Sequence, residues 1–265
     1  MTQPDQDPAR WDPHVAAYER TFEPLTDAFN RRALDLLAPL DGISLLDVAA
    51  GTGGAALAAA ERGAIVVAVD ASPAMVARIA ARGAGRVSAQ MAEAAALPFP
   101  DSTFGAALSS FGVVLLPDPA QGVAEMRRVL RPGGRIAVVT WTEPHRYEVA
   151  ARLRDAVIAV RGAPLEGELP AQLRFTDLDR LRALLMDAGF ASVRVEKVEA
   201  ALHAASAAAL AGSLGFAPGM AAMLDALGPD RAAVLRSFTA RLVGDQGAGA
   251  VVLGAVSHIA VAERP

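Results

Sequence analysis

Two acidic residues and a group of glycines lie where a nucleoside-binding site could form. Asp47 lies in an apolar run, and Gly51 and Gly53 follow within a few residues. Glycine takes positive φ angles and has no Cβ, so a ligand can lie directly against the backbone there. Asp70 ends the next apolar run, 19 residues after Gly51. A carboxylate at that place can accept hydrogen bonds from two ribose hydroxyls, so the sequence predicts a nucleoside ligand.

The glycine segment is compatible with two kinds of nucleoside cofactor. Gly51-Thr-Gly-Gly-Ala-Ala56 fits the loose dinucleotide pattern G-x-G-x-x-G/A, whereas a phosphate-binding P-loop is excluded because no Gly-Lys-Ser/Thr follows. Asp47 argues against NAD, because its carboxylate would repel a pyrophosphate and would suit a ligand with an amino group. S-adenosylmethionine (SAM) carries an ammonium and a sulfonium and no phosphate, so it is the favoured ligand.

Two segments resemble the class I SAM-dependent methyltransferases, in particular small-molecule enzymes of the ubiquinone/menaquinone-biosynthesis type. Residues 47–53 match the first family motif, D-x-G-x-G-x-G, with Ala49 in place of the first glycine. The run from Ala124 to Arg135, which contains Arg-Pro-Gly-Gly, is typical of the same family. The resemblance is close over about residues 43 to 141. It implies SAM as cofactor, S-adenosylhomocysteine as its product, and a set of cofactor-binding residues: Asp47, Ala49, Gly51, Thr52, Gly53, Asp70, Ala71, Met75, Glu93, Ala94, Ser109 and Ser110.

Glu93 takes its predicted role from the resemblance alone. It lies four residues before Leu97-Pro98, where the family has an acidic residue, most often Asp, that reaches the adenine amino group. The alternative is a solvated glutamate at the start of a helix. Both interpretations stay open.

Alternating apolar runs and helical patterns predict an α/β fold. The resemblance implies a Rossmann-like, mostly parallel sheet of seven strands whose last strand is antiparallel. The strands are expected at 43–48, 64–69, 86–91, 104–110, 135–141, 192–198 and 250–261. Helices are expected after the glycine turn and at 73–82, 118–130, 147–160 and 176–188, with a turn at 132–134 and a capping box at 176–179.

Two further helical regions do not belong to the predicted sheet. Residues 1–42 contain a helical pattern from Trp11 and a second one from Asp27 to Leu37. In the resembled family such helices form a lid over the SAM pocket, although they could simply cap the sheet. Residues 203–245 hold three short helical pieces, broken by glycine and proline, that suggest a substrate cap. We therefore expect N-terminal lid helices at 1–42 and one SAM-binding domain at 43–265 with this cap inserted.

Composition excludes several classes of function. A hydrophobic content of 53% with 20% charged residues supports a packed core, and a net charge of −4 without a basic cluster argues against nucleic acid as a partner. The absence of cysteine excludes disulfides and thiolate metal sites, and no other metal-ligand spacing is present. No apolar run of 18 residues is free of glycine and charge, so we expect no membrane span and a soluble, cytoplasmic protein. A homodimer is compatible with the sequence.

Methyl transfer asks little acid–base chemistry of the protein. The acceptor and the methyl group must be held in line and away from water, and a base assists an oxygen or activated carbon acceptor. His145 follows the fifth predicted strand on its ligand-binding side, and His14 and Tyr18 lie on the first helix, so these three are the candidate catalytic residues. His203 is a weaker candidate, and His258 is expected to be structural.

The segment after the fourth predicted strand indicates the type of acceptor. Some relatives carry a histidine there, whereas this chain has Val113-Val-Leu-Leu116, and Gly105 replaces the family's aspartate. An apolar pocket favours a hydrophobic or aromatic acceptor.

Three hypotheses for function follow. The first is O- or C-methylation of a small hydrophobic metabolite, such as a polyketide, a quinone or a fatty-acid-like acceptor. The second is a cyclase of the same fold that binds SAM without transferring its methyl group. The third, NAD-dependent oxidoreduction, is disfavoured by Asp47 and the Arg-Pro-Gly-Gly run.

Overall fold

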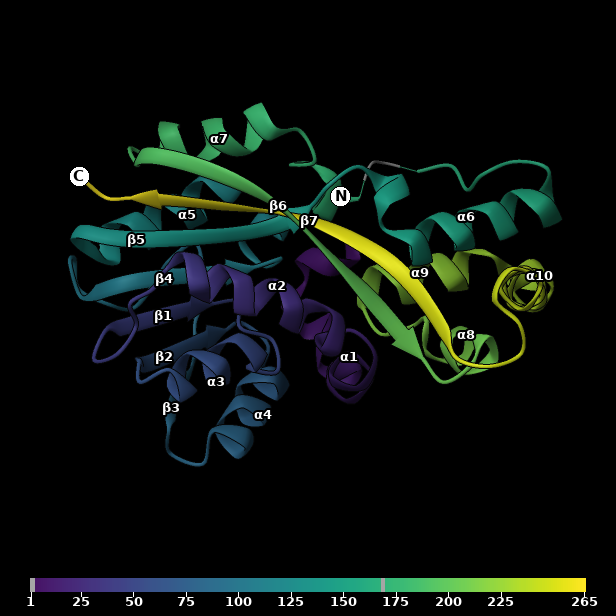
Figure 1. The fold of residues 1–265 in the computed structure, drawn as a ribbon, viewed down its shortest axis with the longest axis horizontal. Helices are drawn as coiled ribbons and strands as arrows, with labels where there is room; N and C mark the ends of the chain where they lie inside the picture. Colours follow the sequence, from purple (N-terminus) through teal and green to yellow (C-terminus); the bar gives the residue numbers. More distant parts are fainter. Residues whose placement is uncertain (1–2, 168–169) are drawn as a thin grey trace.

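The centre of the protein is a seven-stranded sheet with helices on both faces (Figure 1). The structure is a computed structural model, and it describes residues 3–167 and 170–265. The strand order is β3-β2-β1-β4-β5-β7-β6, with β7 antiparallel to both of its neighbours and the other pairs parallel. This confirms the predicted methyltransferase-type sheet. The strands are β1 (Ser44–Val48), β2 (Ile65–Asp70), β3 (Val87–Met91), β4 (Phe104–Ser110), β5 (Leu130–Trp141), β6 (Ala191–Ala204) and β7 (Val251–Glu263).

The helices alternate with the parallel strands and continue into a group between β6 and β7. Several begin at residues that satisfy the free N–H groups of the first turn: the Ser72 hydroxyl accepts from Met75, and the Asp118 carboxylate accepts from Ala120 and Gln121. The α-helices are α1 (Val15–Thr21), α2 (Glu23–Leu36), α3 (Gly54–Glu61), α4 (Pro73–Gly83), α5 (Pro119–Val129), α6 (Glu148–Arg161), α7 (Leu178–Asp187), α8 (Ala207–Ser213), α9 (Pro218–Ala226) and α10 (Arg231–Gln246). The short 3-10 helices are η1 (Pro4–Gln6), η2 (Pro8–Arg10), η3 (Asp12–His14), η4 (Val113–Leu115), η5 (Pro144–Arg146), η6 (Ala171–Leu173) and η7 (Gly228–Asp230).

The sheet separates two hydrophobic clusters. Successive strand residues point to opposite faces, and Leu45 and Leu46 of β1 accordingly belong to different clusters. One cluster includes Phe29 of α2 and Ala56 of α3, and the other includes Met126 of α5 together with leucines of α7. Both faces are therefore covered, which leaves the carboxyl ends of the parallel strands as the open edge for a ligand.

The strands β6 and β7 extend well beyond the rest of the sheet (Figure 1). β5 pairs with β7 only up to Trp141, opposite Ser257, whereas β6 and β7 stay paired to Ala204 and Val251. The two-stranded extension ends at α8 and α10, and α10 packs against α6 and α8. The helical segment between β6 and β7 thus stands at the ligand-binding edge of the sheet.

Some boundaries differ from the sequence prediction. β6 runs to Ala204 rather than to residue 198, and α2 begins at Glu23 rather than at Asp27. Residues 132–134 belong to β5 instead of forming a separate turn, because Gly133 donates to the Arg264 carbonyl at 2.7 Å and Arg264 donates to the Gly134 carbonyl at 2.9 Å. These partners lie far away in the sequence, where a local pattern cannot reveal them.

The capping of α7 also differs from the expected box at residues 176–179. Asp177 is the capping residue, because its carboxylate accepts from the backbone N–H groups of Asp179 and Arg180. By length and composition, no single helix of the described residues could cross a membrane, and only α8 and α9 taken together, with a 98° bend between them, pass that test.

Candidate active site

The glycine loop between β1 and α3 is held in a left-handed backbone by a carboxylate. Ala49, Gly51 and Gly53 have φ angles of 57°, 57° and 88°. The N–H of Gly51 donates to Asp70 Oδ2 at 2.8 Å, and the N–H of Ser72 donates to Asp70 Oδ1 at 2.9 Å. Asp70 therefore has a fixed orientation at the end of β2, next to the crest of the loop.

Ala49 takes the place of the first glycine of the family motif, and a neighbouring glycine makes room for it. A left-handed conformation costs a residue with a Cβ about 1 kcal/mol or more. A Cβ placed on Gly112 would lie 2.3 Å from the Ala49 Cβ, so only glycine fits at position 112 with alanine at 49. The departure from the motif is thus accommodated by Gly112, on the segment after β4.

A cavity of about 380 Å³ opens across the carboxyl ends of the strands. This volume is in the range of small-molecule sites. Its lining includes Asp70 at the end of β2 and Trp141 at the end of β5. In the order β2-β1-β4-β5 these two strands are three spacings apart, or roughly 14 Å at about 4.8 Å each. The site is therefore long enough to have two distinct ends.

The end of the cavity near β2 and β3 carries most of the predicted cofactor residues. Tyr18 and the glycine loop also form part of this wall. The Tyr18 ring lies close to Gly51, where a Cβ would be 3.5 Å from the ring. The predicted residues that line the cavity are Tyr18, Ala49, Gly51, Asp70, Ala71, Met75, Glu93, Ala94 and Ser110.

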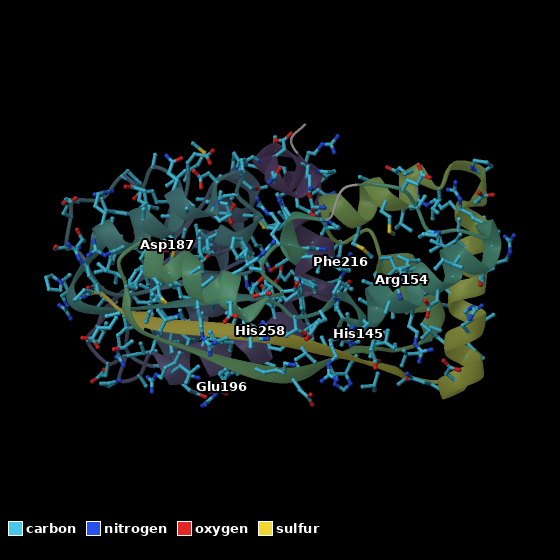
Figure 2. The ribbon with its side chains drawn as sticks, turned by 90° about the horizontal axis from the view of Figure 1, so that it is seen from above. His145, Arg154, Asp187, Glu196, Phe216 and His258 are labelled. Carbon is cyan, nitrogen blue, oxygen red and sulfur yellow. The ribbon has the colours of Figure 1, made fainter. Side chains whose placement is uncertain are left out.

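The opposite end of the cavity is aromatic. The rings of Trp141 and Tyr147 stack with centroids 4.4 Å apart, and Phe111 contacts Trp141 at the same distance. Phe22, between α1 and α2, stacks on Phe216 at 4.8 Å and lies 5.9 Å from Trp141. Figure 2 places Phe216 beside the N-terminal helices, on the segment that leads into α9. All five rings line the cavity, so this end suits a flat apolar group.

The charges around the cavity have one sign. The carboxylates of Asp5, Asp70 and Glu93 line it, and among the described residues of its wall there is no lysine, arginine or histidine. A pyrophosphate would find no neutralising partner there, whereas a cationic nucleoside would be favoured. Across the described ranges, no group of three or more His, Cys, Asp or Glu is arranged to hold a metal ion.

Asp47 lies below the glycine loop in a second, much smaller polar cavity of about 20 Å³. Its side chain is buried, and Oδ2 has no hydrogen-bond partner among the described residues. Burial, together with the charge of Asp70, raises the pKa of Asp47 to about 7. Tyr18, Ala49 and Ser110 line both cavities, so Asp47 is separated from the main cavity only by shared wall residues.

The remaining predicted cofactor residues support the loop from behind. The buried Thr52 hydroxyl donates to Glu23 and lines the smaller cavity. Gly53 packs closely on Ile79, where a Cβ would lie at 3.1 Å. Ser109 is fully buried, donates to the Val48 carbonyl at 2.9 Å and accepts from the backbone of the segment after β4. Neither Gly53 nor Ser109 lines a cavity.

None of the four histidines lines either cavity. His145 is exposed on η5, and His14 Nδ1 lies 2.8 Å from the Gly215 carbonyl, where it joins η3 to the segment before α9. His258 is buried within β7 (Figure 2), where burial lowers its pKa. His14 and His145 therefore do not line the cavities described here, and their role as bases stays a prediction.

Several wall residues were not singled out from the sequence: Asp5, Trp11, Trp141, Tyr147 and Phe216. Trp141 had a usable signal, because it ends a predicted strand on the ligand-binding side. The others come from segments far apart in the chain, and no local pattern brings them together.

Comparison with known proteins identifies the family. A model of the methyltransferase domain matches residues 46–138. The nocamycin O-methyltransferase of Saccharothrix syringae is 34% identical over 240 residues, which cover 81% of this chain and 84% of that enzyme. The demethylmenaquinone methyltransferase of Thermus thermophilus is 36% identical over 194 residues, which cover 66% of this chain and 87% of that enzyme.

The chain belongs to the class I SAM-dependent methyltransferases. SAM is accordingly the cofactor of this methyltransferase, and the hypothesis of NAD-dependent oxidoreduction is set aside. A crystal structure of the 4+2 cyclase SpnF shares the fold, with a TM-score of 0.56 over 90% of this chain and 81% of that one, at 24% identity. The family thus gives the cofactor of the methyltransferase, whereas its acceptor depends on the shape and chemistry of the cavity.

Proposed function

We propose that this methyltransferase methylates an oxygen or carbon atom of a small, hydrophobic, flat acceptor. The observation that carries the proposal is the two-ended cavity, with carboxylates near β2 and β3 and five aromatic rings at the other end. The relatives named as a nocamycin O-methyltransferase and a demethylmenaquinone methyltransferase support a small-molecule acceptor.

The carboxylate end provides the groups that a cationic adenosine compound needs. In this proposal Asp70 accepts hydrogen bonds from the ribose, Glu93 lies near the adenine, and Met75 and Ala94 contact the base. Asp47 lies below the glycine loop, and its unpartnered Oδ2 is the proposed acceptor for the ammonium group of SAM. When bound, SAM supplies an electrophilic methyl group on a sulfonium.

The aromatic end holds the acceptor and excludes water. Phe22 and Trp11 come from the N-terminal region, and Phe216 and Met220 come from the segment between β6 and β7. The N-terminal region thus serves as a lid and the later helices as a cap. Since no histidine reaches this wall, the proposed acceptor is one that is nucleophilic without a strong protein base, such as an electron-rich phenol or enol that binds in its neutral form.

The test is incubation with methyl-labelled SAM and a panel of lipophilic phenols, carboxylic acids and quinones. We expect label in an extracted product from a phenol or quinone. Conversion of an acceptor without label would point instead to a cyclase, and no conversion of any lipophilic compound would contradict the proposal. Asp187→Asn, an exposed change on α7 (Figure 2), is the matched control and should keep full activity, whereas Asp70→Asn should lose it.

A further inference from the structure

A carboxylate also lies at the aromatic end of the cavity. Asp5 of η1 is part of the cavity wall, and so are Phe216 and Met220, which flank its contact with the start of α9. The Trp11 indole, which lines the same cavity, donates to the Asp5 carbonyl at 3.0 Å. Asp5 is therefore a charged group beside the rings where the acceptor is proposed to bind.

The protein uses only one of the two carboxylate oxygens of Asp5. Oδ1 accepts from the N–H of Gly219 at 2.7 Å, and a Cβ on Gly219 would overlap Oδ2, so the carboxylate lies directly against the backbone of α9. Oδ2 accepts no hydrogen bond from the described residues, and it is not among their fully enclosed polar atoms. This oxygen thus has a fixed position and can accept a hydrogen bond from a ligand.

The surroundings of this carboxylate decide which partner suits it. Burial raises the pKa of Asp5, against the opposing effects of the Gly219 N–H and of His14, and so strengthens its oxygens as hydrogen-bond acceptors. The described wall of the cavity has no lysine, arginine or histidine that could pair with it. A protonated amine would bring a second cation into the cavity that holds the sulfonium of SAM, and the two charges would repel. A neutral hydroxyl donates a hydrogen bond without this repulsion.

We propose that Asp5 selects acceptors that carry a hydroxyl group, whose O–H donates a hydrogen bond to Oδ2 while the rest of the molecule packs on the aromatic rings. The inference rests on the proposed function, since it names a specificity-determining residue for the same site. It also gives the N-terminal segment a part in the choice of acceptor.

The experiment compares two probes, 2-naphthol and 2-methoxynaphthalene, which share the ring and the oxygen although only the first can donate. Their affinities are measured by calorimetry at neutral pH with saturating S-adenosylhomocysteine. The wild type should bind 2-naphthol about 10- to 150-fold more tightly, the range for a hydrogen bond to a charged group. In Asp5→Asn this preference should disappear, because the amide oxygen stays on the Gly219 N–H and an NH2 group, which cannot accept, replaces Oδ2.

Asp7→Asn is the matched control, because Asp7 caps η2 on the same segment and does not line the cavity. It should keep the preference. Loss of fold is recognised by the affinity for 2-methoxynaphthalene, which should be no lower in Asp5→Asn than in the wild type.

A preference that survives in Asp5→Asn overturns the proposal, and so does a wild type that binds both probes equally. Binding of S-adenosylhomocysteine alone is measured separately. If it fails while the wild type still prefers 2-naphthol, the proposed function is wrong and the role of Asp5 stands.

Discussion

At the scale of single residues, Asp70 supports the glycine loop and is proposed to bind the cofactor. Its carboxylate already accepts two backbone N–H groups, and we propose that it also accepts the ribose hydroxyls. Asp70→Ala should weaken S-adenosylhomocysteine binding by about 1–3 kcal/mol, because the hydroxyls lose their acceptor. Calorimetry gives this number directly. Unchanged affinity in the variant would show that Asp70 only supports the loop.

Asp47 links the site to pH. Its pKa of about 7 in the folded protein lies above the ordinary value of 3.8, so between these values the folded state holds the extra proton. Stability of the ligand-free protein is therefore lost as pH rises, and this one group costs about 2–3 kcal/mol between pH 5 and pH 8. Asp47→Asn should raise the melting temperature more at pH 8 than at pH 5, because the loss begins above pH 3.8 and grows until about pH 7.

The same residue should make cofactor binding depend on pH. An ammonium favours the charged carboxylate, so S-adenosylhomocysteine affinity should fall as pH drops below about 7, by up to about tenfold per unit. In Asp47→Asn the fall should shift to lower pH, where Asp70, whose pKa burial raises to about 6, takes up its proton, and the affinity at pH 8 should be lower than in the wild type. A variant that keeps the wild-type pH profile would remove Asp47 from the cofactor site.

At the scale of elements, ion pairs fasten the N-terminal helices to the glycine loop. Buried Glu23 of α2 accepts two hydrogen bonds from Arg82 of α4, both at 2.7 Å, and one from the Thr52 hydroxyl. Arg82 also donates to the Thr52 carbonyl at 2.8 Å. The N-terminal helices and the glycine loop are thus connected, so a helix that precedes the first strand supports the loop.

Loss of the Glu23 carboxylate should lower the free energy of unfolding. Glu23→Ala should lower the free energy of unfolding by about 2–4 kcal/mol, because Arg82 and Thr52 lose their shared partner in a largely buried place. Glu19→Ala breaks the neighbouring, more exposed pair with Arg78 and should cost about 0–1 kcal/mol. Urea unfolding measures both. Equal costs for the two variants would contradict the special role of Glu23.

The elements were predictable to the extent that their patterns are local. Apolar runs bounded by glycine or proline located every strand, and Ser72 and Asp118 marked two helix starts correctly. The extension of β6 was not predictable, because its residues gain their pairing from β7, which lies about 50 residues later. The start of β5 depends in the same way on Arg264.

At the scale of the whole molecule, the N-terminal segment and the helices between β6 and β7 meet at the cavity. Asp5 of η1 accepts from the N–H of Gly219 in α9 at 2.7 Å, and the Trp11 indole donates to the Asp5 carbonyl at 3.0 Å. The N-terminal segment therefore contacts the helices between β6 and β7. Asp5, Gln6 and Pro8 form part of the cavity wall.

Removal of residues 1–10 should expose this part of the cavity to water. We use 2-naphthol as a flat aromatic probe of the acceptor end. Its binding should weaken by roughly tenfold, about 1.4 kcal/mol, because this end of the cavity gains contact with water. Amide exchange at Gly219 should become faster, since its N–H loses the Asp5 carboxylate. Exchange at α5, on the far face of the sheet, serves as the control. An unchanged exchange rate at Gly219 would show that the N-terminal segment does not cover this end of the cavity.

The candidate site could be predicted only where one short segment carries it. Asp47, Gly51 and Asp70 follow one another through a strand, a turn and the next strand, so their spacing specifies the carboxylate end. The aromatic end is assembled from Phe22 between α1 and α2, from β5 and from the segment before α9, and such a meeting is a property of the tertiary fold. His145 looked suitable by position along the chain, but it is exposed on η5.

A crystal structure with S-adenosylhomocysteine and 2-naphthol bound together would test the two-ended cavity most directly. We expect the ribose hydroxyls on Asp70 and the naphthol ring against Trp141. Adenosine packed against Trp141, or naphthol bound outside the cavity, would contradict it.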